Sequence, residues 1–293
     1  MLSGTYAEDL VARRSGTPSR PITLAARGRV VIRPASTSGD TYGIQITGSY
    51  FRLRGFVVEG SLGESSANVY LEGSAAHVEI VGNDIRYGQD QGVFADPGTR
   101  YIQILANRIH DNGWHHRSGQ HQSHGIYIEG GNDLIANNVI YAHPYGFGVQ
   151  VYPDNRDSIV VDNTITGSGH SGIVVGGDRG VSGVVIRNNI LAFNRSWGIE
   201  NDSDCPTASV ADHNLLFGNG EGGVDPSCSS LDSSAGNLGG NPRFRSLGSH
   251  DFRLGKGSAA IGRALAAYSL PTDRAGHSRR GKRPPDVGAF ESR

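Results

Sequence analysis

Residues 138–151 read NVIYAHPYGFGVQV and contain the two signatures that decide the fold. An Asn-x-Ile triplet opens this stretch, and a Gly-Val-Gln-Val unit closes it. Apolar side chains alternate with other residues in both signatures, which is typical of a β-strand with one buried face. Both signatures recur along the chain, so this stretch is one copy of a repeat.

The triplet or a close variant recurs in steps of 24, 31, 25, 26 and 25 residues, at Asn83, Asn107, Asn138, Asn163, Asn189 and Asn214. The strand-like unit recurs in steps of 25, 24, 33, 23, 24 and 26 residues, at Gly43, Asn68, Gly92, Gly125, Gly148, Gly172 and Gly198. Repeats of this length without helical periodicity predict stacked coils of short parallel strands. Asparagines at one position of successive coils can hydrogen-bond to each other and form a ladder.

We therefore predict an all-β, single-domain parallel β-helix of roughly eight to ten coils. Residues 1–240 form the helix, and residues 241–293 form an irregular C-terminal capping tail packed on it. Cys205 and Cys228 lie one coil apart, 23 residues, so they form either a disulfide across adjacent coils or two separate thiols. The high glycine content, 43 residues, agrees with many tight turns.

The repeat resembles the right-handed parallel β-helix of pectate lyases, chondroitinase B, alginate lyases and mannuronan epimerases. Two flanking segments carry the same resemblance, GTYAEDLVARRSGTPSRPITL at residues 4–24 and PPDVGAFE at residues 284–291. The second is similar to the DIGAFE motif that closes many secreted β-helix proteins. The resemblance implies a secreted or periplasmic, monomeric protein that acts on a polysaccharide, although the first residues show no signal peptide.

Charge and composition exclude several partners. The net charge of −1 lacks the basic excess of a nucleic-acid-binding surface. No apolar run approaches the roughly 18 residues of a membrane span. Lysine is absent before Lys256, so a lysine base is excluded from the middle of the chain.

Both repeat series slip by seven or eight residues between Ile109 and Gly125. Six of the 11 histidines lie in residues 110–143, and the inserted stretch reads HDNGWHHRSGQHQSH. Its histidines could hold a transition metal, although their spacing matches no firm zinc pattern, or they could belong to a plain polar surface loop. Because the insertion leads straight into the strand that contains Tyr127 and Glu129, we expect it to form one wall of a cleft.

Aligned coils place two columns on the outside of the strand-like units. Tyr70, Phe94 and Tyr127 form an aromatic column, and Glu72, Asp96 and Glu129 form an acidic column. Aromatic faces stack on sugar rings, which predicts a glycan-binding groove. Stacked carboxylates need compensation, either by bound Ca²⁺, by a role as a glycosidase pair, or by Arg86, Arg108, Arg117 or Arg156.

Cleavage of an acidic polysaccharide by β-elimination needs a base, an acid and a group that neutralises the uronate carboxylate. We expect His124 or His143 as the base, and Tyr127, Tyr145 or Tyr152 as the acid. Arg117 is the candidate for the carboxylate. The substrate-binding candidates are Tyr70, Phe94, Trp114, His115, His116, Gln150, Tyr152 and Arg156.

Two other functions stay open. One is a glycoside hydrolase that uses Glu72, Asp96 and Glu129, and the other is a non-catalytic glycan-binding or adhesion protein. The segment GHSG at residues 169–172 is similar to the Gly-His-Gly of polygalacturonases, but the paired aspartates of those enzymes are absent. No cofactor other than Ca²⁺ is expected.

Overall fold

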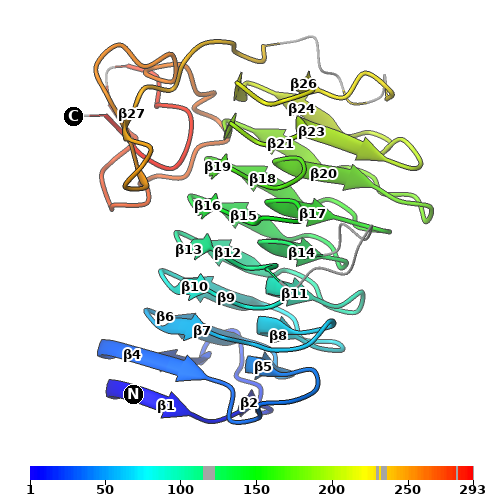
Figure 1. The fold of residues 1–293 in the computed structure, drawn as a ribbon, viewed down its shortest axis with the longest axis vertical. Helices are drawn as coiled ribbons and strands as arrows, with labels where there is room; N and C mark the ends of the chain where they lie inside the picture. Colours follow the sequence, from blue (N-terminus) through cyan, green and yellow to red (C-terminus); the bar gives the residue numbers. More distant parts are fainter. Residues whose placement is uncertain (115–122, 229–230, 232–235, 282, 293) are drawn as a thin grey trace.

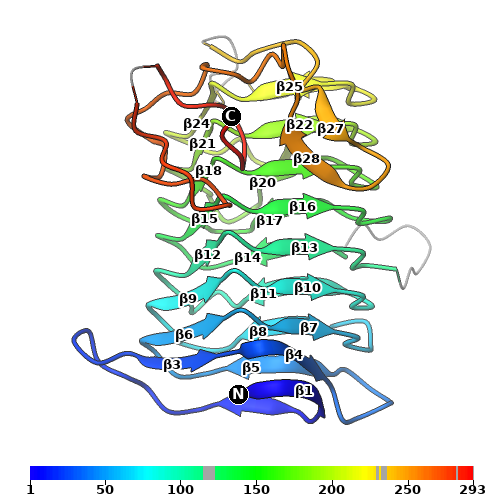
Figure 2. The ribbon, with the colours of Figure 1, turned by 90° about the vertical axis from the view of Figure 1, so that its left-hand side faces the viewer.

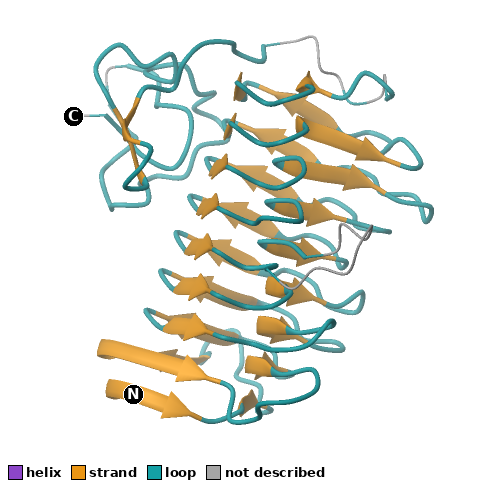
Figure 3. Ribbon diagram, viewed as in Figure 1, coloured by secondary structure: helices purple, strands orange, loops and turns teal. Residues whose placement is uncertain are grey.

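The computed structural model describes residues 1–114, 123–228, 231, 236–281 and 283–292. The chain winds as a parallel β-helix whose coils stack along one long axis (Figure 1). Figure 3 shows strands joined by loops, and within the described ranges no helix is long and apolar enough to cross a membrane. The predicted all-β, single-domain solenoid is confirmed.

Three parallel sheets run along the solenoid, with nine, nine and eight strands among the described residues. The first sheet contains β1 (Leu2–Ala7), β4 (Arg27–Arg33), β7 (Val57–Glu59), β10 (Asp84–Arg86), β13 (Arg108–His110), β16 (Val139–Tyr141), β19 (Thr164–Thr166), β22 (Ile190–Ala192) and β25 (Leu215–Phe217). The second sheet contains β2 (Leu10–Ala12), β5 (Tyr42–Ile46), β8 (Ala67–Leu71), β11 (Gln91–Ala95), β14 (Ile126–Ile128), β17 (Val149–Val151), β20 (Ile173–Gly176), β23 (Trp197–Asp202) and β26 (Gly222–Val224). The third sheet contains β3 (Ile22–Ala25), β6 (Phe51–Arg54), β9 (Val78–Val81), β12 (Gln103–Leu105), β15 (Leu134–Ala136), β18 (Ile159–Val161), β21 (Val185–Arg187) and β24 (Val210–Asp212).

Branched apolar side chains fill the interior at equivalent positions of successive coils. In the second sheet one such column is wholly buried, and it consists of Ile44, Val69, Val93, Ile126, Val149, Ile173 and Ile199. The residue after each of these points outward, because successive side chains of a strand face opposite sides. The register therefore sets which side chains reach the outer surface.

Buried asparagines bridge the coils at the turn before the first sheet. The side-chain N–H of Asn138 donates to Oδ1 of Asn163 at 3.0 Å, and Asn163 donates in the same way to Asn189 at 3.0 Å. Equivalent bonds extend the series from Asn83 to Asn237. These side chains also hydrogen-bond to backbone N–H and C=O groups of the turns, which would otherwise be buried without partners.

The C-terminal tail packs on the side of the upper coils, against the outer face of the first sheet (Figures 1 and 2). It contains an antiparallel pair, β27 (Phe244–Ser246) and β28 (Asp251–Leu254). Arg279 is a buried residue of the tail. It donates to Asn137, to Glu291 and to two backbone carbonyls. Cys205 and Cys228 form a disulfide, which decides between the two alternatives that the sequence left open.

Candidate active site

The outer face of the second sheet carries a continuous stack of aromatic rings. Centroids of Tyr42 and Tyr70 lie 4.5 Å apart, those of Tyr70 and Phe94 5.4 Å, and those of Phe94 and Tyr127 5.0 Å. The rings lie nearly parallel and cover each other's faces. The column was predicted as a platform on which sugar rings stack, but faces that pack on each other leave mainly ring edges for a ligand.

The acidic column beside this stack is compensated by neighbouring side chains. The Tyr70 hydroxyl donates to Asp96 at 2.9 Å, the Tyr127 hydroxyl donates to Glu129 at 2.5 Å, and the Gln45 amide donates to Glu72. Burial and the nearby Asp96 raise the pKa of Glu129, whereas Arg179 opposes that rise. The hydrogen bond from Tyr127 opposes the rise more strongly than Arg179 does.

The arginines considered for compensation of the acidic column lie elsewhere or are not described. Arg86 pairs with Glu59 and Asp84, and Arg108 bonds to Tyr141, all on the first sheet. Arg156 contacts Ser182 at 3.4 Å. Across the described ranges no group of three or more His, Cys, Asp or Glu side chains is arranged to hold a metal ion, so the Ca²⁺ site stays a prediction from the sequence.

A groove of about 510 Å³ opens where the aromatic stack ends, at Phe94 and Tyr127. Phe147 and Tyr152 add aromatic surface, and Gln91 and Gln150 add amides. Its described acids are Glu64, Asp90, Glu200 and Asp202, and its described histidines are His124 and His170. The groove follows the second sheet across the coils from β11 to β23.

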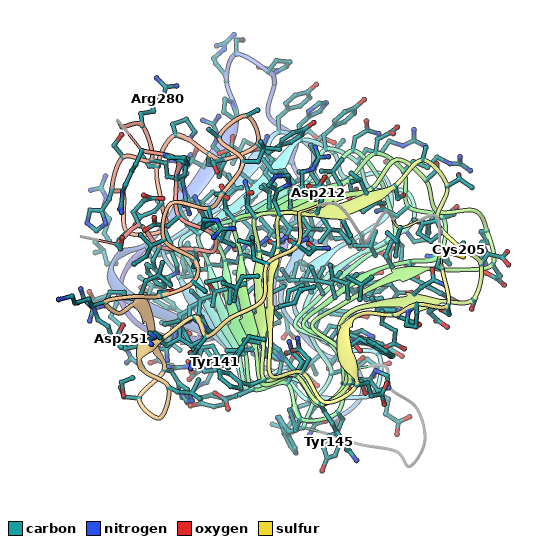
Figure 4. All side chains as sticks on the ribbon, turned by 90° about the horizontal axis from the view of Figure 1, so that it is seen from above. Tyr141, Tyr145, Cys205, Asp212, Asp251 and Arg280 are labelled. Atoms are coloured by element: carbon teal, nitrogen blue, oxygen red, sulfur yellow. A yellow bond between two sulfur atoms is a disulfide. The ribbon has the colours of Figure 1, made fainter. Side chains whose placement is uncertain are left out.

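Several predicted site residues are not among the described residues that line this groove. Tyr70, Trp114, Tyr145 and Arg156 are not among its described lining residues, and neither are Glu72, Asp96 and Glu129. Tyr145 projects outward at a corner of the coil, with 39% of its surface exposed (Figure 4). His115, His116 and Arg117 lie outside the described residues.

His143 is wholly buried and is not among the described residues that line the groove. It occupies the turn position held by Asn112 in the coil below and by Ser168 in the coil above, where side chains point inward. Its Nδ1 lies 3.3 Å from the carbonyl oxygen of Asn112. Burial lowers the pKa of His143 to about 4, which keeps the ring neutral in the interior.

His124 lies in the groove with only 1% of its surface exposed. The backbone N–H of Phe147 donates to its Nδ1 at 3.2 Å, and the two rings stack with centroids 5.2 Å apart. An acceptor Nδ1 means that the neutral ring carries its proton on Nε2. His124 therefore suits a hydrogen-bond donor toward substrate, whereas the predicted role of base would need a free lone pair on Nε2.

Asp90 is a functional candidate that sequence reasoning missed. It is buried at the groove wall, and the Gln91 amide donates to its Oδ1 at 3.2 Å. Gln91 Oε1 also accepts the backbone N–H of His124 at 2.8 Å, which ties the two residues together. Burial raises the pKa of Asp90 to about 8, so this carboxyl group is largely protonated at neutral pH.

His170 and Glu200 are the other residues that were missed. Nδ1 of His170 lies 3.0 Å from Oε2 of Glu200, and the Ser171 hydroxyl donates to the same carboxylate. In the register of the second sheet Glu200 occupies the position of Tyr127 three coils further on, and the spacing of the repeat was the available signal. His170 precedes the strand-like unit, in a turn whose side-chain direction the alternation does not fix.

Comparison with known proteins adds the fold family. A family model described as a right-handed β-helix region matches residues 67–237. The crystal structure of pectate lyase Pel9A is similar, with 14% identity and a TM-score of 0.67 over 99% of this chain and 84% of that one. The crystal structure of the alginate lyase from Paenibacillus sp. str. FPU-7 is also similar. It gives 19% identity and a TM-score of 0.58 over 76% of this chain and 89% of that one.

A third similar structure is the A-module of the Azotobacter vinelandii mannuronan C-5 epimerase AlgE4. It gives 20% identity and a TM-score of 0.59, over 76% of this chain and 63% of that one. No curated protein matches the sequence. At these identities the solved structures share the fold with this chain.

Proposed function

The chain belongs to the family described as the right-handed β-helix region, and we propose that its groove binds a uronate-containing polysaccharide and cleaves it by β-elimination. The observation that carries this proposal is the groove itself, which combines imidazole, tyrosine and a buried carboxyl group. Pectate lyase and alginate lyase structures with the same fold support it, since both names describe cleavage of acidic polysaccharides.

In β-elimination a base removes the C5 proton of a uronate, and the electron pair forms a C4–C5 double bond. The C4–O bond then breaks, and the leaving oxygen takes a proton from an acid. Tyr152 lines the groove and is our candidate for this acid. The Nε2–H of His124 is our candidate for the hydrogen bond to the uronate carboxylate, whose negative charge grows in the transition state.

The charge of the groove fits an anionic substrate better than a count of its acids suggests. Asp90 has a pKa of about 8, so near neutral pH it is mainly a neutral carboxylic acid. A neutral carboxylic acid donates a hydrogen bond to a carboxylate, whereas an ionised one would repel it. Asp90 and His124 are therefore our two candidate donors to the substrate carboxylates.

The test is a panel of alginate, pectate and glycosaminoglycans incubated with the protein, with absorbance read at the band of unsaturated products. The proposal expects rising absorbance with at least one uronate polymer. New reducing ends without absorbance would indicate hydrolysis instead. Neither signal on any polymer would exclude both kinds of cleavage.

A glycan-binding protein without turnover is the second candidate. No arginine or lysine is found among the described residues that line the groove, and this observation favours binding without lyase chemistry. Measured affinity for a polysaccharide that stays intact would support it. The hydrolase that uses Glu72, Asp96 and Glu129 has less support, because none of the three is among those lining residues.

We propose an extracellular or periplasmic location. The disulfide between Cys205 and Cys228 supports it, since disulfides persist mainly in oxidising compartments. A polysaccharide substrate, which is too large to enter a cell unprocessed, agrees with this location.

A further inference from the structure

His170 lies at the end of the groove nearest to β23, and three contacts hold it there. Its Nδ1 is 3.0 Å from Glu200 Oε2, and its ring meets the Phe147 ring edge-on with centroids 4.7 Å apart. Its backbone N–H donates to the carbonyl oxygen of Gly146 at 3.0 Å. The ring is therefore fixed on one side and lines the groove on another.

Glu200 is itself held in place. The Ser171 hydroxyl donates to the same Oε2, and the Ser171 oxygen accepts the backbone N–H of Trp197 at 2.9 Å. A carboxylate that accepts a hydrogen bond from a hydroxyl group still has lone pairs that can accept hydrogen bonds from other donors. Nδ1 of His170 lies 3.0 Å from this oxygen, within the distance of an ion pair when the ring is protonated.

The carboxylate favours a proton on Nδ1 of His170, because only a protonated nitrogen is attracted to it. In the neutral ring this places the lone pair on Nε2. His124, whose Nδ1 accepts the Phe147 N–H, has the opposite tautomer with its proton on Nε2. Phe147 thus separates one imidazole that donates through Nε2 from one that accepts through Nε2.

We propose that His170 is the base of the β-elimination and that Glu200 is the residue that positions it. This inference rests on the proposed function of the groove. Nε2 of His170 takes the C5 proton, the C4–O bond breaks as the double bond forms, and Tyr152 gives its hydroxyl proton to the leaving oxygen. The imidazolium that results is stabilised by the Glu200 carboxylate.

The decisive variant is Glu200→Gln, which keeps the size and the hydrogen-bonding capacity of the side chain but removes its charge. Nitrogen-detected NMR of the histidine rings in the wild-type protein should show His170 with its proton on Nδ1. In Glu200→Gln the share of His170 rings that carry the proton on Nδ1 should fall, because the nearby anion is lost. A wild-type His170 with its proton on Nε2 would overturn the inference without any substrate.

Turnover gives a second, independent readout. Glu200→Gln should lower kcat about 100-fold with little change in KM, as expected when the orienting partner of a catalytic base is lost. Glu200→Asp should recover part of the rate. The other ionisable side chains among the described lining residues are Glu64, Asp90, His124, Tyr127, Tyr152 and Asp202.

Glu221→Gln is the matched control, because Glu221 is an exposed acid of the next coil and is not among the described lining residues. It should leave kcat and the position of the proton on the His170 ring unchanged. If wild-type protein cleaves no polymer, the lyase function fails, and the role of His170 as base fails with it. If wild-type protein is active but Glu200→Gln has the same kcat, only the role of Glu200 is contradicted.

Discussion

The backbone N–H of Phe147 donates to Nδ1 of His124 across 3.2 Å, and this bond joins two consecutive coils. It fixes the imidazole in the tautomer that carries its proton on Nε2. His124→Asn should keep an acceptor for this N–H and lose the Nε2–H. We expect kcat/KM to fall at least ~100-fold with little loss of stability, because only the donor to the substrate is removed.

Steady-state kinetics and thermal unfolding of His124→Asn check this expectation. His213→Asn is the control, since His213 pairs with Asp212 on the third sheet, away from the groove. Equal activity in the two variants would rule out a role for the Nε2–H of His124.

Asp90 should make stability depend on pH. Its pKa is about 8 in the folded protein and about 3.9 for a free side chain, so the folded state holds a proton that the unfolded chain has lost. Its contribution to the free energy of unfolding should therefore decrease as pH rises from about 4 to about 8, and then level off. Asp90→Asn should remove this part of the slope, as urea unfolding at pH 5, 7 and 9 can show.

The same carboxyl group should affect binding of an anionic oligosaccharide. Affinity should fall as pH rises through about 8, because Asp90 loses its proton and begins to repel the uronate. Asp90→Asn should bind with nearly constant affinity over this range. Calorimetric titrations at pH 7 and 9 test it, and an equally steep fall in Asp90→Asn would assign the effect to another group.

Asn163 should be among the most costly asparagines to replace. Its side chain donates to Asn189 and to the carbonyl oxygens of Ile135 and Val161, and it accepts two bonds from Asn138. Asn163→Ala leaves several buried groups without partners, and we expect a loss of about 2 to 4 kcal/mol. Denaturant unfolding measures it, with exposed Gln103→Ala expected to change stability by less than about 0.5 kcal/mol.

Arg279 should hold the C-terminal tail against the solenoid. It is buried and bonds to Glu291 and Asn137, and its Nε lies 3.8 Å from Asp162. Arg279→Leu removes the charge that these partners face, at a cost of about 3 to 5 kcal/mol for a buried pair. We expect faster proteolysis within residues 241–281.

Arg280 is the matched control for this variant, because it is exposed and points away from the body of the molecule (Figure 4). Arg280→Leu should be cleaved at the wild-type rate. If both variants resist the protease equally, the contacts of Arg279 do not retain the tail.

The repeat could be read from the sequence because each coil satisfies the same local rules. Alternating apolar residues at fixed steps determine which side chains face inward, and the register of Val93, Ile126 and Val149 follows from them. The outward column with Phe94, Tyr127 and Gln150 follows from the same alternation. These relationships depend on spacing along the chain, which a sequence contains.

The turns could not be read in this way. His143 and His170 both lie in turns that lead into the second sheet, yet the first points into the core and the second lines the groove. The direction of a side chain in a turn depends on the local backbone angles and on the coil below. The alternation of residues along a strand therefore does not determine it. The sequence therefore does not show that His143 is buried or that His170 lines the groove.

The sequence by itself determined a solenoid of stacked coils, its interior columns and the strip of tyrosines and acids on one outer face. Only the tertiary structure decided that the aromatic rings cover one another, that the tail packs on the first sheet, and that Asp90, His124 and His170 share one groove. The physical reason is that periodicity fixes inside and outside along a strand. Contacts between turns of different coils arise only when those coils are stacked in space.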